Sequence, residues 1–145
     1  MDYQQITNLC DPDIPRLMEI LRLPEIARYI SIDEGNFWNY ITTNPAVSYF
    51  KAYREDKLVG ALDCELQGKK LYLSVMVLPE YQKQGLGTQM LQDLLSGKLL
   101  SFDTAEVYIE EGNTPSVKLF EKMGFAPKFR DGKLIIYTYN KNALT

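Results

Sequence analysis

The stretch VLPEYQKQGLGTQML, residues 77 to 91, joins a strand pattern to a helix pattern through a turn that contains two glycines. The first N–H groups of a helix have no partner within the helix, and the helix dipole adds positive potential at that end. Glycines at 85 and 87 let an anion approach the backbone closely and tolerate positive φ angles. The turn is therefore either a phosphate cradle or a tight corner between strand and helix.

Two well-known phosphate loops do not match this turn. The chain has no G-x-x-x-x-G-K-[ST] sequence, which the nucleotide-triphosphate loop requires. The dinucleotide fingerprint G-x-G-x-x-G needs a small residue where Met90 stands. A G-x-G pair alone is weak evidence, so the rest of the chain has to identify the ligand.

Length and composition predict one folded domain over residues 1–145. Hydrophobic residues make up 46% of the chain and charged residues 24%, close to the globular average. No apolar run approaches the roughly 18 residues of a membrane span, and MDYQQITNLCDPD lacks the basic-then-apolar layout of a signal peptide. We expect a cytoplasmic protein with no membrane partner.

The chain contains no histidine, which removes the commonest general base and the commonest metal ligand. We therefore expect no metal site, and acid–base chemistry must use carboxylates, tyrosines, lysines or water. The formal net charge of −3 argues against a nucleic-acid surface and favours a cationic partner.

Hydrophobic periodicity predicts alternating strands and helices around one sheet. Strand patterns occupy residues 3–9, 48–54, 58–66, 71–78, 105–110, 126–130 and 133–139. Helix patterns occupy residues 15–21, 26–30, 33–42, 86–95 and 115–123. We therefore expect a mixed α/β fold whose sheet is mostly antiparallel and is flanked by helices.

Particular residues set the boundaries and positions of these elements. Pro115 suits the first turn of a helix and Gly124 its end, while Asp131-Gly132 is typical of a tight hairpin. Residues 71–78 are apolar at nearly every position apart from Ser74, which predicts a central strand covered on both faces.

Two motifs resemble those of the GCN5-related N-acetyltransferase (GNAT) family. The family's acetyl-CoA signature is Q/R-x-x-G-x-G/A, and residues 82–87 read QKQGLG. Residues 113–125, NTPSVKLFEKMGF, resemble the family's second segment, N-x-x-[AS]…L-[YF]-E-K-x-G-F. The resemblance implies a GNAT-like fold over nearly the whole chain and an acetyl-CoA-dependent transfer of acetyl to a primary amine.

The resemblance also implies which residues hold acetyl-CoA. The backbone amides of the turn would bind the pyrophosphate, main-chain groups of the preceding strand would pair with the pantetheine arm, and two residues near the second helix would contact the pantetheine or the phosphates. The turn residues are Gln82, Lys83, Gln84, Gly85, Leu86, Gly87 and Thr88. The strand residues are Met76, Val77 and Leu78, and the two residues near the second helix are Asn113 and Ser116. Lys83 is equally consistent with a solvated loop charge, and Asn113 with a helix cap.

For catalysis, the resemblance implies that the N–H of Val77 polarises the thioester carbonyl, as an oxyanion-type donor. Many relatives protonate the departing thiolate with a tyrosine of the second segment, but this chain has Phe120 there. Tyr108, Tyr137 and Tyr139 are the alternative acids, unless the thiolate leaves unassisted, which its ordinary pKa of about 8.5 permits.

A base is expected because a lysine-like amine, with a pKa of about 10.4, is mostly protonated at pH 7. The candidate bases are Glu110 and Glu111, which end one predicted strand, and Asp63 and Glu65 of another strand. Asp63 and Glu65 share one face of that strand by their i, i+2 spacing. That face forms an acidic amine site if it points into the cleft and ordinary solvated charge if it points outward.

The acceptor amine is not identified by any motif. Residues 24–40 supply Tyr29, Asp33, Glu34, Trp38 and Tyr40, which suit a cationic or aromatic amine or a buried edge. The leading hypothesis is an N-acetyltransferase. The alternatives are a non-catalytic acyl-CoA-binding module, which the Phe120 departure favours, and an interaction domain in which the glycines serve only the turn. The fold also allows a homodimer.

Overall fold

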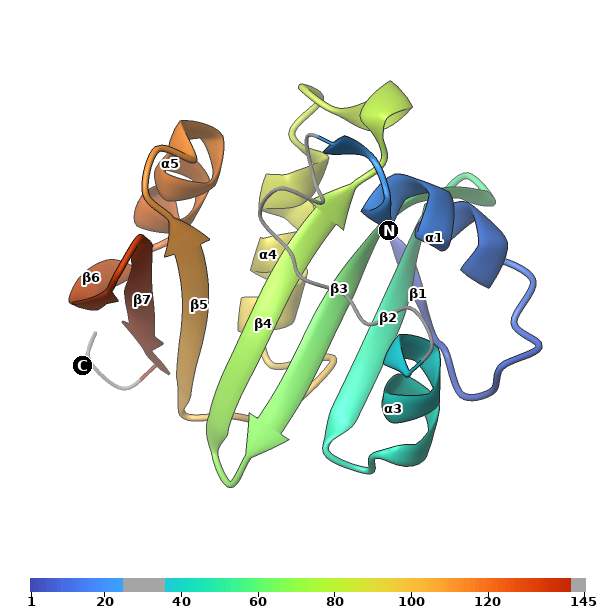
Figure 1. Ribbon diagram of the computed structural model, residues 1–145, viewed down its shortest axis with the longest axis horizontal. Helices are drawn as coiled ribbons and strands as arrows, with labels where there is room; N and C mark the ends of the chain where they lie inside the picture. Colours follow the sequence, from blue (N-terminus) through green and yellow to red (C-terminus); the bar gives the residue numbers. More distant parts are fainter. Residues whose placement is uncertain (25–35, 142–145) are drawn as a thin grey trace.

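The computed structural model describes residues 1–24 and 36–141, which form one seven-stranded sheet with helices on both faces (Figure 1). The strands are β1 (Asp2–Gln5), β2 (Val47–Arg54), β3 (Lys57–Gln67), β4 (Lys70–Val77), β5 (Thr104–Glu110), β6 (Ala126–Asp131) and β7 (Leu134–Asn140). The helices are α1 (Ile14–Leu21), α3 (Phe37–Thr43), α4 (Leu86–Leu95) and α5 (Thr114–Lys122), with a short 3₁₀ turn, η1, at Pro79–Tyr81.

The strand order across the sheet is β1-β2-β3-β4-β5-β7-β6, with β4 in the centre. Every neighbouring pair is antiparallel except β4 and β5, which run parallel. The fold class, the mostly antiparallel sheet and the central position of the 71–78 run are thus confirmed.

Predicted boundaries agree with the structure to within about two residues for most elements, and two of them need correction. The first strand ends at Gln5. The Ile6 N–H still donates to the Tyr49 carbonyl at 2.8 Å, and the chain then turns, with the Asn8 side chain accepting a hydrogen bond from the Cys10 N–H. The predicted 33–42 helix starts at Phe37 among the described residues. The predicted 26–30 helix lies outside them.

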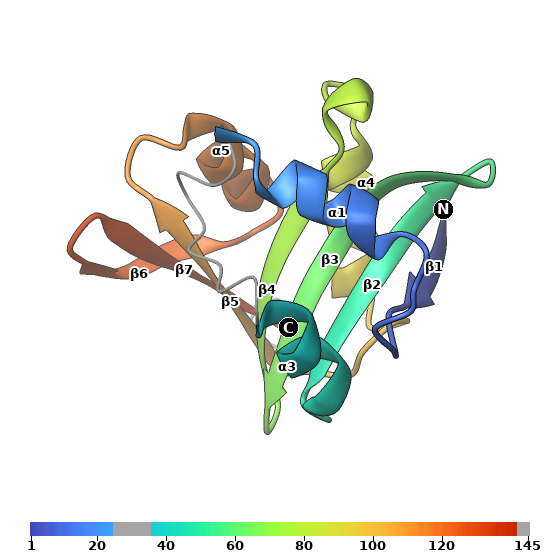
Figure 2. The same ribbon diagram turned by 45° about the vertical axis from the view of Figure 1, so that its right-hand side comes forward.

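The two faces of the sheet carry different residues, as the pleat requires. On one face Leu62, Leu71 and Leu73 pack with α4 and α5 in the larger core. On the other face Tyr49 and Ala61 pack with α1 and α3 in a smaller core. Figure 2 shows α1 and α3 over β2 and β3.

Within residues 1–24 and 36–141, no element covers the second face of β4, so the prediction that both faces of this strand are covered is confirmed on the α4 side only. Leu71 and Leu73 are buried on the α4 side, whereas Ser74 on the other side is exposed. Two cavities lie on this half of the sheet, between β3 and β5.

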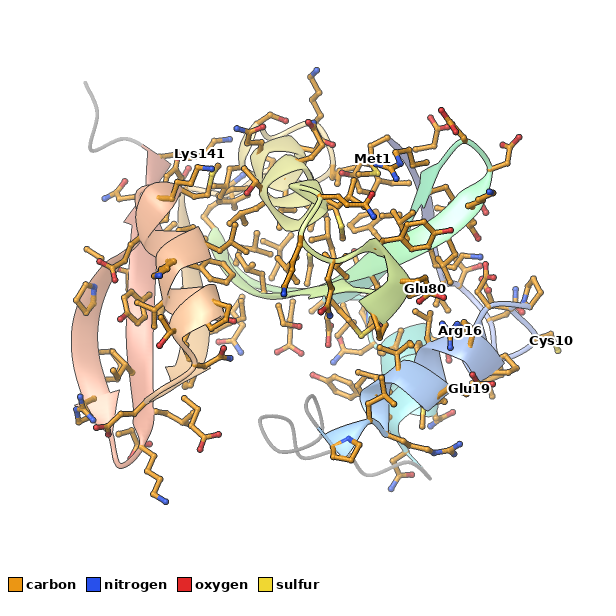
Figure 3. All side chains as sticks on the ribbon, turned by 90° about the horizontal axis from the view of Figure 1, so that it is seen from above. Met1, Cys10, Arg16, Glu19, Glu80 and Lys141 are labelled. Carbon is orange, nitrogen blue, oxygen red and sulfur yellow. The ribbon has the colours of Figure 1, made fainter. Side chains whose placement is uncertain are left out.

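Polar contacts fasten the N-terminal segment to this frame. The Lys51 ammonium, almost fully buried on β2, lies 2.9 Å from carboxylate oxygens of both Asp11 and Asp13. Arg16 of α1 makes two hydrogen bonds, of 2.9 and 2.7 Å, to the carboxylate of Glu80 in η1 (Figure 3). Helix α1 is therefore held against the turn that follows β4.

Candidate active site

The site begins where β4 and β5 separate. These strands pair only over Lys70–Tyr72 and Thr104–Glu106, and beyond Tyr72 the two diverge (Figure 1). From that point β4 keeps its partner β3 on one side, while β5 pairs with β7 on its other side. The edge of β4 that faces β5 is thus free of strand pairing from Leu73 to Val77.

The N–H and C=O of Val77 point toward this free edge. In an antiparallel pair, successive residues alternate between bonding to the partner strand and pointing away from it. The Leu78 N–H donates to the Val59 carbonyl at 2.9 Å, so Leu78 and Met76 face β3, and Val77 faces the gap. Of the three residues expected to pair with a pantetheine arm, Val77 is therefore the one whose main-chain groups are directed to the gap.

The turn after β4 places backbone amides in a left-handed arrangement. Lys83 has φ of 63° and Gly85 has φ of 78°, and α4 starts directly afterwards at Leu86. Alternating backbone conformations of this kind turn neighbouring N–H groups toward one concave spot, which suits an anion. The Gln82 side-chain amide donates to the Val77 carbonyl at 3.2 Å and so links the end of the strand to the turn.

The two glycines of the turn differ in role. Gly85 has positive φ, and a Cβ there would meet no described atom within 4 Å, so the backbone conformation alone demands glycine. Gly87 does not have positive φ, which corrects that expectation. A Cβ at Gly87 would lie 3.6 Å from Leu119 Cδ2 and 3.7 Å from Val77 Cγ2, which is ordinary contact.

The remaining turn residues point in several directions. Leu86 is buried in the core. The side-chain amide oxygen Oε1 of Gln84 accepts a hydrogen bond of 2.9 Å from Arg54, whose guanidinium carbon lies 6.0 Å from the centre of the Tyr81 ring. Lys83 is exposed and Thr88 is half-buried. An acetyl-CoA contact of Leu86 would thus involve its main chain only.

A cavity of about 630 Å³ opens beside the free edge of β4. Eight of the residues predicted from the sequence line it: Met76, Val77, Gln82, Asn113, Ser116, Asp63, Tyr108 and Glu110. Glu65 and the turn residues 83–88 do not line it. Asn113 lies at the N-cap of α5 but makes no capping bond within the described chain, so its side chain faces the cavity without that role.

A second cavity of about 360 Å³ adjoins the first. Both are lined by Asp63, Ser74 and Phe37, so Asp63 stands where the two meet. Glu65 lines the second cavity, and its carboxylate accepts a hydrogen bond from the Tyr40 hydroxyl. The face of β3 that carries Asp63 and Glu65 therefore points into the cavities.

Burial, together with the charge of Glu65, raises the pKa of the Asp63 carboxyl to about 6. Burial and the nearby Asp63 charge also raise the pKa of the Tyr49 hydroxyl above its ordinary range. The hydrogen bond to Glu65 raises the pKa of Tyr40. Asp63 is thus ionised at neutral pH yet able to take up a proton at modest cost.

Several aromatic side chains shape the cavities. Phe120 lines the larger cavity, is 3% exposed, and packs edge-on against Phe125 with ring centres 5.1 Å apart. Trp38, a candidate acceptor contact, is buried against Phe37 and Tyr49 instead. The candidates Tyr29, Asp33 and Glu34 lie outside the described residues.

Sequence reasoning did not identify Ser74 and Phe37 as cavity residues. Ser74 is the single polar interruption of an apolar strand, a signal that in retrospect marks the face open to the cavities. Tyr137 is buried in the core and does not line either cavity.

Residues 14–125 match the acetyltransferase (GNAT) family model, and the chain belongs to this family. An N-alpha-acetyltransferase of Sulfurisphaera tokodaii is 34% identical over 55 residues, a match that spans 37% of this chain and 33% of that protein. Among the described residues, no helix has the length and apolar character needed to cross a membrane.

Solved structures share the fold over nearly the whole chain. A domain from Methanocaldococcus jannaschii has a TM-score of 0.81 and 19% identity, covering 96% of this chain and 97% of that one. Campylobacter jejuni N-acetyltransferase PseH, solved with acetyl coenzyme A, has a TM-score of 0.78 and 14% identity, covering 97% and 99%. At these identities the likeness establishes the GNAT fold.

Proposed function

We propose that the protein is an acetyl-CoA-dependent N-acetyltransferase that transfers acetyl to a primary amine. The observation that carries this proposal is the free edge of β4 at Val77, which is followed, after η1, by the left-handed turn before α4. An extended polar arm can pair along such an edge while an attached diphosphate meets the turn. Family membership supports the same donor.

On the donor side, the backbone amides of residues 82–88 hold the pyrophosphate at the positive end of α4. The pantetheine arm lies along β4 and makes its main-chain contact at Val77. Asn113 and Ser116, at the start of α5, contact the arm from the opposite wall of the cavity. The Lys83 ammonium adds a positive charge beside the phosphates.

The Val77 N–H polarises the thioester carbonyl. Its position at an unpaired strand edge leaves this donor without a partner strand, and a fixed N–H stabilises the negative charge that develops on the carbonyl oxygen. Removing one such donor from comparable sites slows catalysis by about 10²- to 10³-fold.

Asp63 is the base. Its carboxylate lines the same cavity as Val77, and a pKa of about 6 is close to the value that suits a base working near neutral pH. Glu110 is the second carboxylate of this cavity and the alternative base. Tyr108, half-exposed at the cavity wall, is positioned to protonate the thiolate in place of the residue at 120.

The reaction balances with these groups. An ammonium R–NH₃⁺ gives one proton to Asp63, the neutral amine attacks the carbonyl carbon, a C–N bond forms and the C–S bond breaks. The thiolate takes a proton through Tyr108, which is replenished by the proton that the new amide nitrogen loses. The products are the acetamide and CoA, and Asp63 returns its proton to water.

A non-catalytic acyl-CoA-binding module remains the second candidate, favoured by Phe120 at the family's usual tyrosine position. Both candidates require acetyl-CoA binding, but only the enzyme releases CoA thiol in response to an added amine. The cytoplasmic location, the absence of nucleic-acid and membrane partners, and the homodimer stay predictions from the sequence and the family.

The test combines calorimetry with a thiol-release assay. Titration with acetyl-CoA should show micromolar binding, and an amine panel should then give amine-dependent CoA release. Binding without release for every amine supports the module. No binding at two temperatures overturns both.

A further inference from the structure

The two adjoining cavities are lined by acidic and aromatic side chains, and together they offer more room than a single amino group requires. We propose that the acceptor is a small diamine: its reacting nitrogen lies at Asp63, in the larger cavity, and its second, cationic nitrogen lies at Glu65, in the adjoining cavity. This inference rests on the proposed acetyltransferase activity and adds the class of acceptor.

Charge supports a cation over any other acceptor. The described residues that line the two cavities include three carboxylates, Asp63, Glu65 and Glu110, and no lysine or arginine. Lys70, beside the second cavity, is already paired with the buried Glu106 carboxylate at 2.8 Å. An acceptor with its own carboxylate would therefore meet only like charge.

The environment of Asp63 indicates a bound ligand independently of the number of carboxylates in the cavities. Its side chain is largely buried, and within residues 1–24 and 36–141 it has no hydrogen-bond or ion-pair partner. A buried carboxylate without a partner is unfavourable unless something occupies the space in front of it. That space is the junction of the two cavities, the larger of which is also lined by Val77.

The second cavity has the features of a site for an alkylammonium group. Its walls include the rings of Phe37, Tyr40 and Tyr72 together with the Glu65 carboxylate. Aromatic faces attract ammonium ions. The Tyr72 ring already holds the Lys70 ammonium, 5.2 Å from its centre, so the rings offered to a ligand are those of Phe37 and Tyr40. The hydrogen bond from the Tyr40 hydroxyl fixes the Glu65 carboxylate in this cavity.

The spacing of the carboxylates sets the length of the diamine. Residues i and i+2 of a strand are about 7 Å apart along one face. A four-carbon chain separates its terminal nitrogens by about 6 Å when extended. Chains of three to five carbons therefore span from Asp63 to Glu65, whereas two carbons are too short to reach both.

Three acceptors with four carbons each test the proposal: 1,4-diaminobutane, butylamine and 4-aminobutanoate, which end in a cation, a methyl group and an anion. We expect kcat/KM for CoA thiol release to be at least about tenfold higher for the diamine than for butylamine, and lowest for 4-aminobutanoate. Among diamines of two to eight carbons, the optimum should fall at three to five.

Glu65→Gln should collapse the preference, so that the diamine-to-butylamine ratio of kcat/KM falls to about one. Glu121→Gln, an exposed position on α5, is the matched control and should keep the wild-type ratio. Acetyl-CoA affinity, measured by calorimetry, should match wild type in both variants, which shows that each is folded.

Equal rates for the diamine and butylamine in the wild type, or a ratio that survives Glu65→Gln, overturns the proposal. So does acetylation of other amines with no diamine turnover. These results leave the proposed activity intact as long as acetyl-CoA binds and some amine is acetylated. Failure to bind acetyl-CoA would instead remove the proposed function, and this inference with it.

Discussion

Asp63 and Glu65 lie two residues apart on one face of β3, and burial together with the Glu65 charge raises the pKa of Asp63 to about 6. Two carboxylates thus lie in the walls of the adjoining cavities, Asp63 where the two cavities meet and Glu65 in the smaller one. The sheet register explains this placement, because Asp63 pairs with Tyr49 of β2 and Ser74 of β4, both of which also line the cavity.

The raised pKa has an effect on stability whose sign can be worked out. Between about pH 4 and pH 6 the native state binds more protons at Asp63 than the unfolded chain, so the free energy of unfolding falls as pH rises through this window. Asp63→Asn removes the free-energy cost of ionising this carboxyl in the folded protein. We expect the variant to be about 3 kcal/mol more stable than wild type at pH 8 and equal to it below pH 4, by urea denaturation.

The same variant should lose activity. The wild-type kcat/KM should rise through about pH 6 as Asp63 ionises, and Asp63→Asn should remove that limb and lower the rate by at least about 10²-fold. If the pH–rate profile keeps its limb in Asp63→Asn and loses it in Glu110→Gln, the base is Glu110.

The glycine turn gives a matched pair of variants. Gly85→Ala places an alanine at φ of 78°, so we expect the turn to change shape and acetyl-CoA affinity to fall at least about tenfold. Gly87→Ala meets only ordinary contacts and should cost less affinity. Calorimetry with acetyl-CoA measures both. Equal losses would show that the close approach at Gly87 matters as much as the left-handed backbone at Gly85.

Charge at the same turn gives a stronger test of the ligand. Gly87→Glu adds bulk and negative charge where the diphosphate is expected, so binding of acetyl-CoA should be abolished while the thermal unfolding midpoint stays near that of Gly87→Ala. Retained binding in Gly87→Glu would argue against diphosphate at this turn.

Tyr108 and Phe120 can exchange roles if a tyrosine protonates the thiolate. Tyr108→Phe should lower kcat by about tenfold or more, with little effect on acetyl-CoA affinity. Phe120 lines the same cavity, so adding Phe120→Tyr to that variant should restore part of the rate. Unchanged kcat in Tyr108→Phe would mean that the thiolate leaves without this acid.

The Lys51 ion cluster stabilises the fold away from the site. Lys51→Met leaves the Asp11 and Asp13 carboxylates without their buried cation, and we expect a loss of about 3 kcal/mol in the free energy of unfolding. Lys57→Met, exposed at the β2–β3 turn, should change stability by less than about 1 kcal/mol. Comparable losses in the two variants would contradict the assigned role of the cluster.

The loss of stability in acid should also depend on this ion cluster of Lys51, Asp11 and Asp13. The Lys51 and Tyr53 hydrogen bonds lower the pKa of Asp13, although burial opposes them. A lowered carboxyl pKa adds stability above about pH 4 that is lost as pH falls through the folded value. Asp13→Asn should therefore flatten the acid limb of the unfolding curve relative to wild type.

The sequence alone determined the elements whose geometry depends on local backbone chemistry. Three features follow from which residues tolerate a conformation or lack an N–H: the positive φ at Gly85, Pro115 in the first turn of α5, and the hairpin at Asp131-Gly132. The family motifs occupy these same local features, so the turn and the donor side of the site could be predicted without coordinates.

Tertiary structure decided the free strand edge at Val77 and the acceptor side, because both depend on contacts between residues that are distant in the sequence. The divergence of β4 from β5 after Tyr72 frees the edge at Val77, and no residue within β4 signals it. The placement of α1 and α3 leaves the Asp63 and Glu65 face open. Periodicity shows that two side chains share a face, but what covers that face is set by long-range packing.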